Sequence, residues 1–171
     1  MKPLPKHSFS ASPEWDEQAF MAAHTQPSIV SLRLNPHKVS KLDWGIDSTV
    51  PWCSNGIYLK ERPVFTLDPL LHAGAYYVQE ASSMFLQHAY KQLIQKNNGS
   101  LRVLDLCAAP GGKSSLLAAL LNKNDLLVAN EVIQNRAAIL SENLTRWGQM
   151  NTWVSNNDPK DFSKLPAYFD A

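Results

Sequence analysis

The chain has 171 residues, of which 44% are hydrophobic and 18% charged, a composition typical of a globular protein and unlike that of a disordered chain. The formal net charge is +1, and neither side of Gly74 departs from balance, with 7 basic and 7 acidic residues before it and 9 and 8 after it. Charge therefore gives no positive evidence for nucleic-acid binding. Two cysteines, Cys53 and Cys107, are too few for a disulfide framework or a zinc site, and they favour a reducing, cytoplasmic context.

The first 73 residues contain 8 of the 11 prolines. Residues 13–23 predict one helix, and short apolar runs at 29–34 and 56–59 predict strands separated by turns. We therefore expect a small α+β N-terminal domain over residues 1–73. The N-terminus lacks the apolar region of a secretory signal, and no apolar run approaches the ~20 residues of a membrane span.

From residue 74 onward, helices and strands alternate along the chain. Helical spacing of apolar residues predicts helices over 80–95 and 133–147, the second ending at Gly148, and a further helix runs from Gly111-Gly112 to Leu121. Strands are predicted at 102–106, 126–129 and 152–154, with a fourth starting at 168–170.

This alternation predicts an α/β fold with a parallel sheet and helices on its faces. A doubly wound sheet needs more strands than these. We therefore expect residues 74–171 to form the first half of a Rossmann-like domain in a truncated chain, the alternative being a complete three-strand domain.

The turn after the strand at 102–106 is the segment most informative about chemistry. It consists of small residues from Cys107 to Gly112 and leads directly into a helix. Gly111 and Gly112 adopt positive φ without a Cβ penalty, and Pro110 fixes the backbone before them. Such a turn lets a ligand approach backbone N–H groups at the carboxyl end of a strand.

Three ligands compete for this turn. A nucleoside triphosphate is disfavoured, because a P-loop requires glycine where Cys107 stands. A dinucleotide is disfavoured, because the segment lacks the G-x-G-x-x-G pattern. S-adenosylmethionine needs no phosphate cradle, and Asp105 can orient the turn or meet the cationic end of that ligand.

Acidic residues follow two further strands. Glu131 lies 19 residues after Gly112, close to the ~20-residue spacing at which an acid accepts hydrogen bonds from ribose hydroxyls. Asp158, preceded by Asn156 and Asn157, follows the next strand. Each acid alone is more typical of a helix cap or a turn, but the three strand ends together predict a nucleoside site.

The segment Leu104–Lys113 resembles the cofactor motif of the Sun/Fmu-type RNA cytosine-5 methyltransferases, which include ribosomal RNA methyltransferases of bacteria. The similarity covers nearly the whole chain from about residue 28. It extends to the Arg-x-Asn element at 31–36, to 68–69 and 74–84, and downstream to Asn130-Glu131, Arg136 and 143–148.

The resemblance implies a Rossmann-like, S-adenosylmethionine-dependent methyltransferase behind a small N-terminal domain. It implies methylation of C5 of a cytosine in RNA, with ribosomal RNA as the expected partner. The residues that it assigns to the cofactor are Cys107, Ala108, Ala109, Pro110, Gly111, Gly112, Lys113, Glu131, Arg136 and Asp158.

Both catalytic cysteines of such enzymes lie in later loops, an Asp-Ala-Pro-Cys loop and a Thr-Cys loop. Neither motif occurs before Ala171. We therefore expect no catalytic residue in this chain and no activity from it alone, and Cys107 is interpreted as a small turn residue.

Two other functions stay open: a non-catalytic RNA-binding or assembly module with a vestigial cofactor turn, and a P-loop nucleotide hydrolase. Lys113 is interpreted as a contact to the cofactor carboxylate, and Tyr76 and Tyr77 as core residues. We expect no metal and no membrane partner, and a monomer for the full-length protein. Residues that are candidates for RNA contact are Arg33, Lys38, Lys41, Trp52, Lys60 and Arg62.

Overall fold

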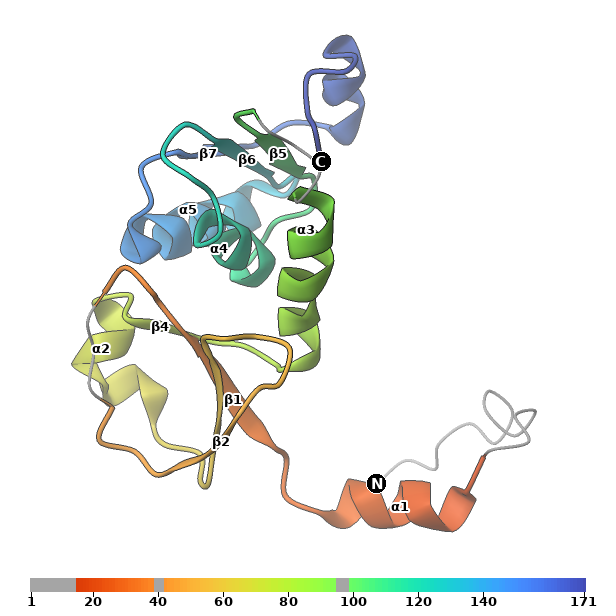
Figure 1. Ribbon diagram of the computed structural model, residues 1–171, viewed down its shortest axis with the longest axis vertical. Coiled ribbons are helices and arrows are strands. Elements are labelled where there is room, and N and C mark those ends of the chain that lie inside the picture. The colour runs from red at the N-terminus through yellow and green to blue at the C-terminus, as the bar shows by residue number, and fades with distance from the viewer. Residues whose placement is uncertain (1–14, 39–41, 95–98) are drawn as a thin grey trace.

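The computed structural model describes residues 15–38, 42–94 and 99–171. They form a four-stranded sheet of order β2-β3-β1-β4 and a three-stranded sheet of order β5-β6-β7. Helices α4 and α5 lie between the two sheets, and α3 runs along one side of them (Figure 1). The small-residue turn belongs to the second sheet.

Helix α1 spans Glu17–Thr25. Asp16 caps it, because its carboxylate accepts a hydrogen bond from the Ala19 backbone N–H at 2.9 Å. The helix starts later than the predicted range of 13–23, and residues 13 and 14 lie outside the part that the structure describes. No α1 side chain is buried, and the helix extends away from the first sheet (Figure 1).

The first sheet is antiparallel and consists of β1 (Val30–Leu34), β2 (Ile46–Thr49), β3 (Gly56–Leu59) and β4 (Tyr76–Val78). The predicted strands at 29–34 and 56–59 are confirmed as β1 and β3. Strands β2 and β4 were not expected from the sequence. The β2 side chains are all exposed, so no apolar alternation marks it, whereas β4 is only three residues long.

Strand β4 pairs with β1, although it lies after the boundary at residue 74 that composition predicts. The boundary stays a prediction, but the first sheet uses residues from both sides of it. Its core contains Leu32, Ile57, Phe65 and Tyr76.

The segment between β3 and β5 contains η1 (Phe65–Leu67), α2 (Pro69–His72), η2 (Ser82–Phe85) and α3 (Leu86–Ile94). The prediction of one helix over 80–95 is wrong in its first turn, which is a 3-10 helix. No side chain caps that turn, and 3-10 turns are common at the N-terminus of an α-helix. Gln95 lies outside the described residues.

The second sheet is parallel and consists of β5 (Arg102–Asp105), β6 (Leu126–Asn130) and β7 (Thr152–Ser155). Helices α4 (Gly112–Ala118) and α5 (Gln134–Trp147) connect these strands, and η3 (Pro159–Lys164) follows them. Helix α4 ends three residues before the predicted Leu121. Helix α5 ends as predicted, because Gly148 adopts the left-handed conformation with φ of 89°.

No strand forms at 168–170, so the predicted fourth strand is wrong. The backbone instead makes two hydrogen bonds to β5, from Asp170 N–H to the Arg102 carbonyl and from Leu104 N–H to the Ala171 carbonyl, both 2.8 Å long. Two bonds do not make a ladder. They lie on the edge of β5 away from β6, since the backbone groups of Leu101 and Leu126 pair on the other edge.

Candidate functional site

The turn between β5 and α4 is fixed by backbone contacts on both sides. The Ala108 N–H donates to the Asn130 carbonyl at the end of β6, and the Gly111 N–H donates to the Ala108 carbonyl, each at 2.8 Å. The Ala109–Pro110 peptide is cis, and Gly111 has φ of 110°. A Cβ at Gly111 would lie 3.3 Å from Leu140 Cδ1 of α5, so a left-handed backbone and a close helix both require glycine there.

Asp105 ends β5 and is tied to α4. Its Oδ2 accepts a hydrogen bond from Ser114 Oγ at 2.7 Å. Ser114 is fully buried, whereas Asp105 is half-buried and Lys113 is exposed. The carboxylate therefore orients the turn and keeps accepting capacity toward the carboxyl end of the strand.

A cleft of about 230 Å³ lies between this turn and the segment that follows β4. A Cβ at Gly112 would lie 3.3 Å from Tyr77 Cε1 and 3.4 Å from Gln79 Nε2, so glycine keeps the two walls close together. Of the predicted cofactor residues, the structure places six in this cleft. The lining consists of Tyr77, Val78, Gln79, Glu80, Ser83, Cys107, Ala108, Ala109, Pro110, Gly112 and Lys113.

Glu131 and Arg136 form an ion pair that contacts the turn between β5 and α4. The Glu131 side chain is 3% exposed, accepts from the Ile133 N–H at 3.1 Å, and lies 3.3 Å from Arg136 Nη1. Arg136 Nη2 donates to the Ala109 carbonyl at 2.9 Å. The pair thus connects the end of β6 to the turn, and neither residue lines the cleft. The proposed role of each in cofactor binding stays a prediction.

Asp158 is exposed and caps η3, since its Oδ1 accepts from the Lys160 N–H at 2.9 Å. It does not line the cleft. Its neighbour Asn157 is nevertheless linked to the end of β5, because the Asn130 side chain donates to the carbonyls of both Leu106 and Asn157. Asp158 therefore stays a candidate at the same edge of the sheet.

Asn130 is the residue that sequence reasoning missed as a structural centre of the site. It is fully buried at the end of β6. Its Nδ2 donates to the Leu106 carbonyl at 3.3 Å and to the Asn157 carbonyl at 3.0 Å. Its Oδ1 accepts from Ser155 Oγ at 2.8 Å and from the Asn157 N–H at 3.0 Å. One side chain thus holds three strand ends together, and its place beside Glu131 was the available signal.

Arg33 is not available for RNA contact, so that prediction is wrong. It is 2% exposed and extends from β1 into the helical layer. It donates to Gln79 Oε1 at 2.8 Å, to Ser115 Oγ at 2.6 Å, and more weakly to the Gly112 and Ser115 carbonyls at 3.3 and 3.4 Å. Its guanidinium also lies 4.5 Å from the centre of the Trp147 ring. Burial lowers the pKa of Arg33 to about 10.

Arg33 and Asn35 together dock the first sheet on the second layer. Asn35 Nδ2 donates to the Gly74 and Trp147 carbonyls, both at 3.0 Å. The Arg-x-Asn element is therefore an internal joint. Its contacts reach the first turn of α4, next to the small-residue turn.

The other candidates for RNA contact divide into three groups. Lys38 Nζ donates to the Ala73 and Arg146 carbonyls at 2.6 Å each, and Trp52 is half-buried with its Nε1 donating to the Ala81 carbonyl at 2.7 Å. Lys41 lies outside the described residues. Two candidates stay exposed, namely Lys60 and Arg62.

The two tyrosines before the cleft differ. Tyr76 is a core residue as predicted, with its hydroxyl donating to Asp68 Oδ2 at 2.8 Å. Tyr77 is half-buried, and its hydroxyl donates to the Pro110 carbonyl at 3.4 Å. Tyr77 thus contacts the small-residue turn directly.

Neither cysteine is paired: Cys53 is 1% exposed, and Cys107 is exposed in the turn. Among the residues that the structure describes, no cluster of three His, Cys, Asp or Glu side chains is placed to hold a metal ion. In the same residues, no helix is long and apolar enough to cross a membrane.

The sheet and its turn match solved methyltransferase structures. A methyltransferase homolog protein from Pyrococcus horikoshii superposes with a TM-score of 0.71 at 29% identity, over 91% of this chain and 53% of that protein. The parallel β5-β6-β7 sheet with its helices is therefore part of a Rossmann-like methyltransferase fold.

Two protein families match successive parts of the chain: the N-terminal domain of 16S rRNA methyltransferase RsmF over residues 8–81, and 16S rRNA methyltransferase RsmB/F over residues 91–171. Together the two family models match most of the chain, and they confirm the resemblance to the Sun/Fmu-type methyltransferases seen in the sequence.

Individual relatives agree with this assignment. Ribosomal RNA small subunit methyltransferase F of Pectobacterium atrosepticum is 36% identical over 166 residues, and that of Vibrio cholerae serotype O1 is 38% identical over 167 residues. Each match covers 89% of this chain and 34% of the relative. The chain thus spans about a third of the length of these relatives.

Proposed function

We propose that this chain is the cofactor-binding part of an S-adenosylmethionine-dependent methyltransferase that acts on 16S ribosomal RNA. The cleft between the small-residue turn and the segment after β4 is the observation that carries the proposal, because it joins six of the residues that the resemblance assigns to the cofactor. When bound, S-adenosylmethionine supplies a methyl group activated by a sulfonium centre.

The residues of the cleft fit that ligand. The turn offers backbone groups and small side chains, so a ligand can lie close to the main chain. Lys113 is exposed at the cleft and can pair with a carboxylate. Asp105 does not line the cleft, but beyond its bond to Ser114 it keeps acceptor capacity for a cationic or N–H group. A P-loop needs glycine at the position that Cys107 occupies, so this turn does not provide the phosphate-binding loop that a nucleoside triphosphate requires.

The finer features of the reaction are proposals as well. We propose that the methyl group goes to C5 of a cytosine, and that Cys53 and Cys107 are not the nucleophile. Cys53 is buried in the core with Val50 and Met84, where no base can reach it, and Cys107 lies in the turn that contacts the cofactor. We also propose that the protein acts in the cytoplasm, where its proposed ribosomal RNA substrate is found.

Calorimetric titration of the chain with S-adenosylmethionine, and separately with ATP, tests cofactor choice. We expect S-adenosylmethionine to bind and ATP not to bind. Lys113→Gln should weaken S-adenosylmethionine binding about 10-fold, the loss of one charge-assisted contact. Lys123→Gln is the matched control, because Lys123 is equally exposed in the turn before β6.

Binding of ATP without S-adenosylmethionine would contradict the proposal, and equal losses in the two lysine variants would remove Lys113 from the site. Transfer of labelled methyl groups to unmodified 16S rRNA by the full-length protein tests the substrate. Labelling of protein or DNA in place of the rRNA would contradict that part.

A further inference from the structure

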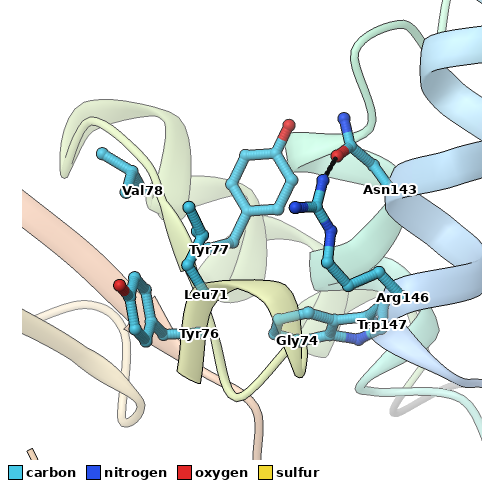
Figure 2. Close-up of a pocket in the computed structure, with 8 residues that line it drawn as sticks. All are labelled: Leu71, Gly74, Tyr76, Tyr77, Val78, Asn143, Arg146 and Trp147. Atoms are coloured by element: carbon cyan, nitrogen blue, oxygen red, sulfur yellow. Dashed lines mark hydrogen bonds between the residues drawn. The ribbon is translucent and has the colours of Figure 1, made fainter. Parts of the chain in front are cut away.

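A second cleft of about 220 Å³ adjoins the cofactor cleft on the far side of Tyr77. Its walls come from α2 and β4 on one side and from the last turns of α5 on the other, as Figure 2 shows. The lining residues are Leu71, Gly74, Tyr76, Tyr77, Val78, Asn143, Arg146 and Trp147. Of these side chains, the Tyr77 ring and the Arg146 guanidinium lie beside each other in the cleft (Figure 2).

The junction that forms this cleft is closely packed. A Cβ at Gly74 would clash with the Arg146 carbonyl oxygen, and Gly74 has φ of 68°. Lys38 Nζ donates to that same Arg146 carbonyl at 2.6 Å. The walls are therefore fixed relative to each other, so the cleft is preformed.

Arg146 is oriented but not neutralised. Its Nη2 donates to Asn143 Oδ1 (Figure 2), and Asn143 Nδ2 in turn donates to the Pro110 carbonyl at 2.7 Å. Its only acidic neighbour among the described residues, Glu142, is 3.9 Å away with a side chain 75% exposed, a geometry that contributes little. A fixed guanidinium with free N–H donors is the group that proteins use for phosphate oxygens.

Tyr77 provides the second recognition element. Its ring and the Arg146 guanidinium face each other across the cleft (Figure 2). Burial raises the pKa of Tyr77, and the charges of Arg33 and Arg146 oppose that shift. The hydroxyl is therefore protonated at neutral pH, and the ring offers a face for a nucleobase.

The cleft shares Tyr77 and Val78 with the cofactor cleft, so a ligand bound in it lies beside the cofactor, where the substrate of a group transfer must also lie. We propose that this cleft binds one nucleotide of the substrate RNA strand, with Arg146 on its phosphate and Tyr77 beside its base. The inference rests on the proposed function and adds to it a contact surface next to the cofactor cleft.

Anisotropy titration of the full chain with a labelled single-stranded RNA of about 12 nucleotides tests this subsite. Arg146→Gln should weaken binding about 5- to 10-fold and reduce the slope of log K against log salt by about 0.7, the value for one phosphate contact on a single strand. Arg146→Lys should restore most of the salt slope and only part of the RNA affinity, because lysine keeps the positive charge but lacks the paired N–H donors of the guanidinium.

Lys123→Gln is the matched control for charge, and it should leave both quantities unchanged. In Arg146→Gln, the loss of S-adenosylmethionine affinity should be much smaller than the loss of RNA affinity, because Arg146 reaches the cofactor turn only through Asn143; this difference separates the subsite from the cofactor cleft. Failure of the unchanged chain to bind S-adenosylmethionine would count against the proposed function alone.

Four results would overturn the subsite. The first is an unchanged salt slope in Arg146→Gln, and the second is an equal loss of RNA affinity in Lys123→Gln. The third is no RNA binding by the unchanged chain. The fourth is binding of free cytidine monophosphate as tight as that of the RNA and equally dependent on Arg146, since this would make the cleft a mononucleotide site.

Discussion

Arg33 allows a quantitative test of what a buried charge contributes to this fold. Its two short bonds go to Gln79 Oε1 and Ser115 Oγ, and its two long bonds go to the Gly112 and Ser115 carbonyls. A lysine ammonium cannot reach both walls at once, so Arg33→Lys loses about two charge-assisted bonds. At about 1.5 kcal/mol each, the loss in the free energy of unfolding is about 3 kcal/mol.

Arg33→Met removes the two short and the two weaker bonds and leaves buried acceptors of Gln79 and Ser115 without a partner, which together cost about 6 kcal/mol. It also removes the cost of burying a charge. Burial lowers the pKa of Arg33 from 12.5 to about 10, which corresponds to about 3 kcal/mol against the charged form. The net loss is again about 3 kcal/mol, so we expect the two variants to be equally destabilised although only one keeps the charge.

Urea unfolding at neutral pH, followed by tryptophan fluorescence, measures both variants. Arg62→Lys and Arg62→Met are the controls, because Arg62 is exposed and, among the described residues, its guanidinium lies only over the Phe65 ring, 5.5 Å from the ring centre, and each should change stability by less than about 1 kcal/mol. If Arg33→Met were more than about 2 kcal/mol less stable than Arg33→Lys, the charge itself would be stabilising, and the reasoning would be refuted.

Three further outcomes are expected. Tyr90→Phe should raise the free energy of unfolding by about 1 kcal/mol, because the buried Tyr90 hydroxyl has no hydrogen-bond partner among the described residues. Tyr76→Phe should lower it by about 1 kcal/mol, because the bond to Asp68 is lost. Denaturant titration of the two variants checks both signs. Burial raises the pKa of Tyr90 from 10.0 to about 12, so ionisation of Tyr90 leaves the free energy of unfolding unchanged below pH 10.0 and lowers it as the pH rises toward 12. Unfolding curves across that range should decline less in Tyr90→Phe, and an unchanged decline would contradict the assignment. Gly74→Ala should cost about 3 kcal/mol or more, because the left-handed backbone and the Arg146 carbonyl both exclude a Cβ, while Gly99→Ala, with open space around it, should cost little by the same thermal melt.

Local patterns predicted the elements that local forces determine. Helix α5 and its end at Gly148 follow from apolar spacing and from a glycine in the left-handed conformation. The turn from Cys107 to Gly112 was predicted from its small residues after a buried strand. These features depend on neighbours within a few positions, which a sequence displays directly.

The joint between the sheets could not be predicted in that way. Arg33 is exposed in most contexts by residue type, and its partners Gly112 and Ser115 lie 79 and 82 positions away. Asn35 donates to a carbonyl 112 positions away. No spacing rule connects such residues, so a buried arginine was predicted to be a surface cation.

The same limit applies at the candidate site. The turn was identified from the sequence, but the opposite wall from Tyr77 to Ser83 was not, because β4 belongs to the other sheet. Asn130 was overlooked for a related reason. Its role comes from three strand ends that meet only after the sheet has formed.

The double contact of Asn35 with Gly74 and Trp147 has an evolutionary consequence. Many proteins exchange an N-terminal module by recombination, because few contacts cross the boundary between modules. Here a transplanted module would have to bring an arginine on β1 and an asparagine just after that strand, both placed to hydrogen-bond to groups of the second layer. We therefore expect the two layers to be inherited as a pair, so that a substitution on one side of the joint restricts which residues are tolerated on the other side.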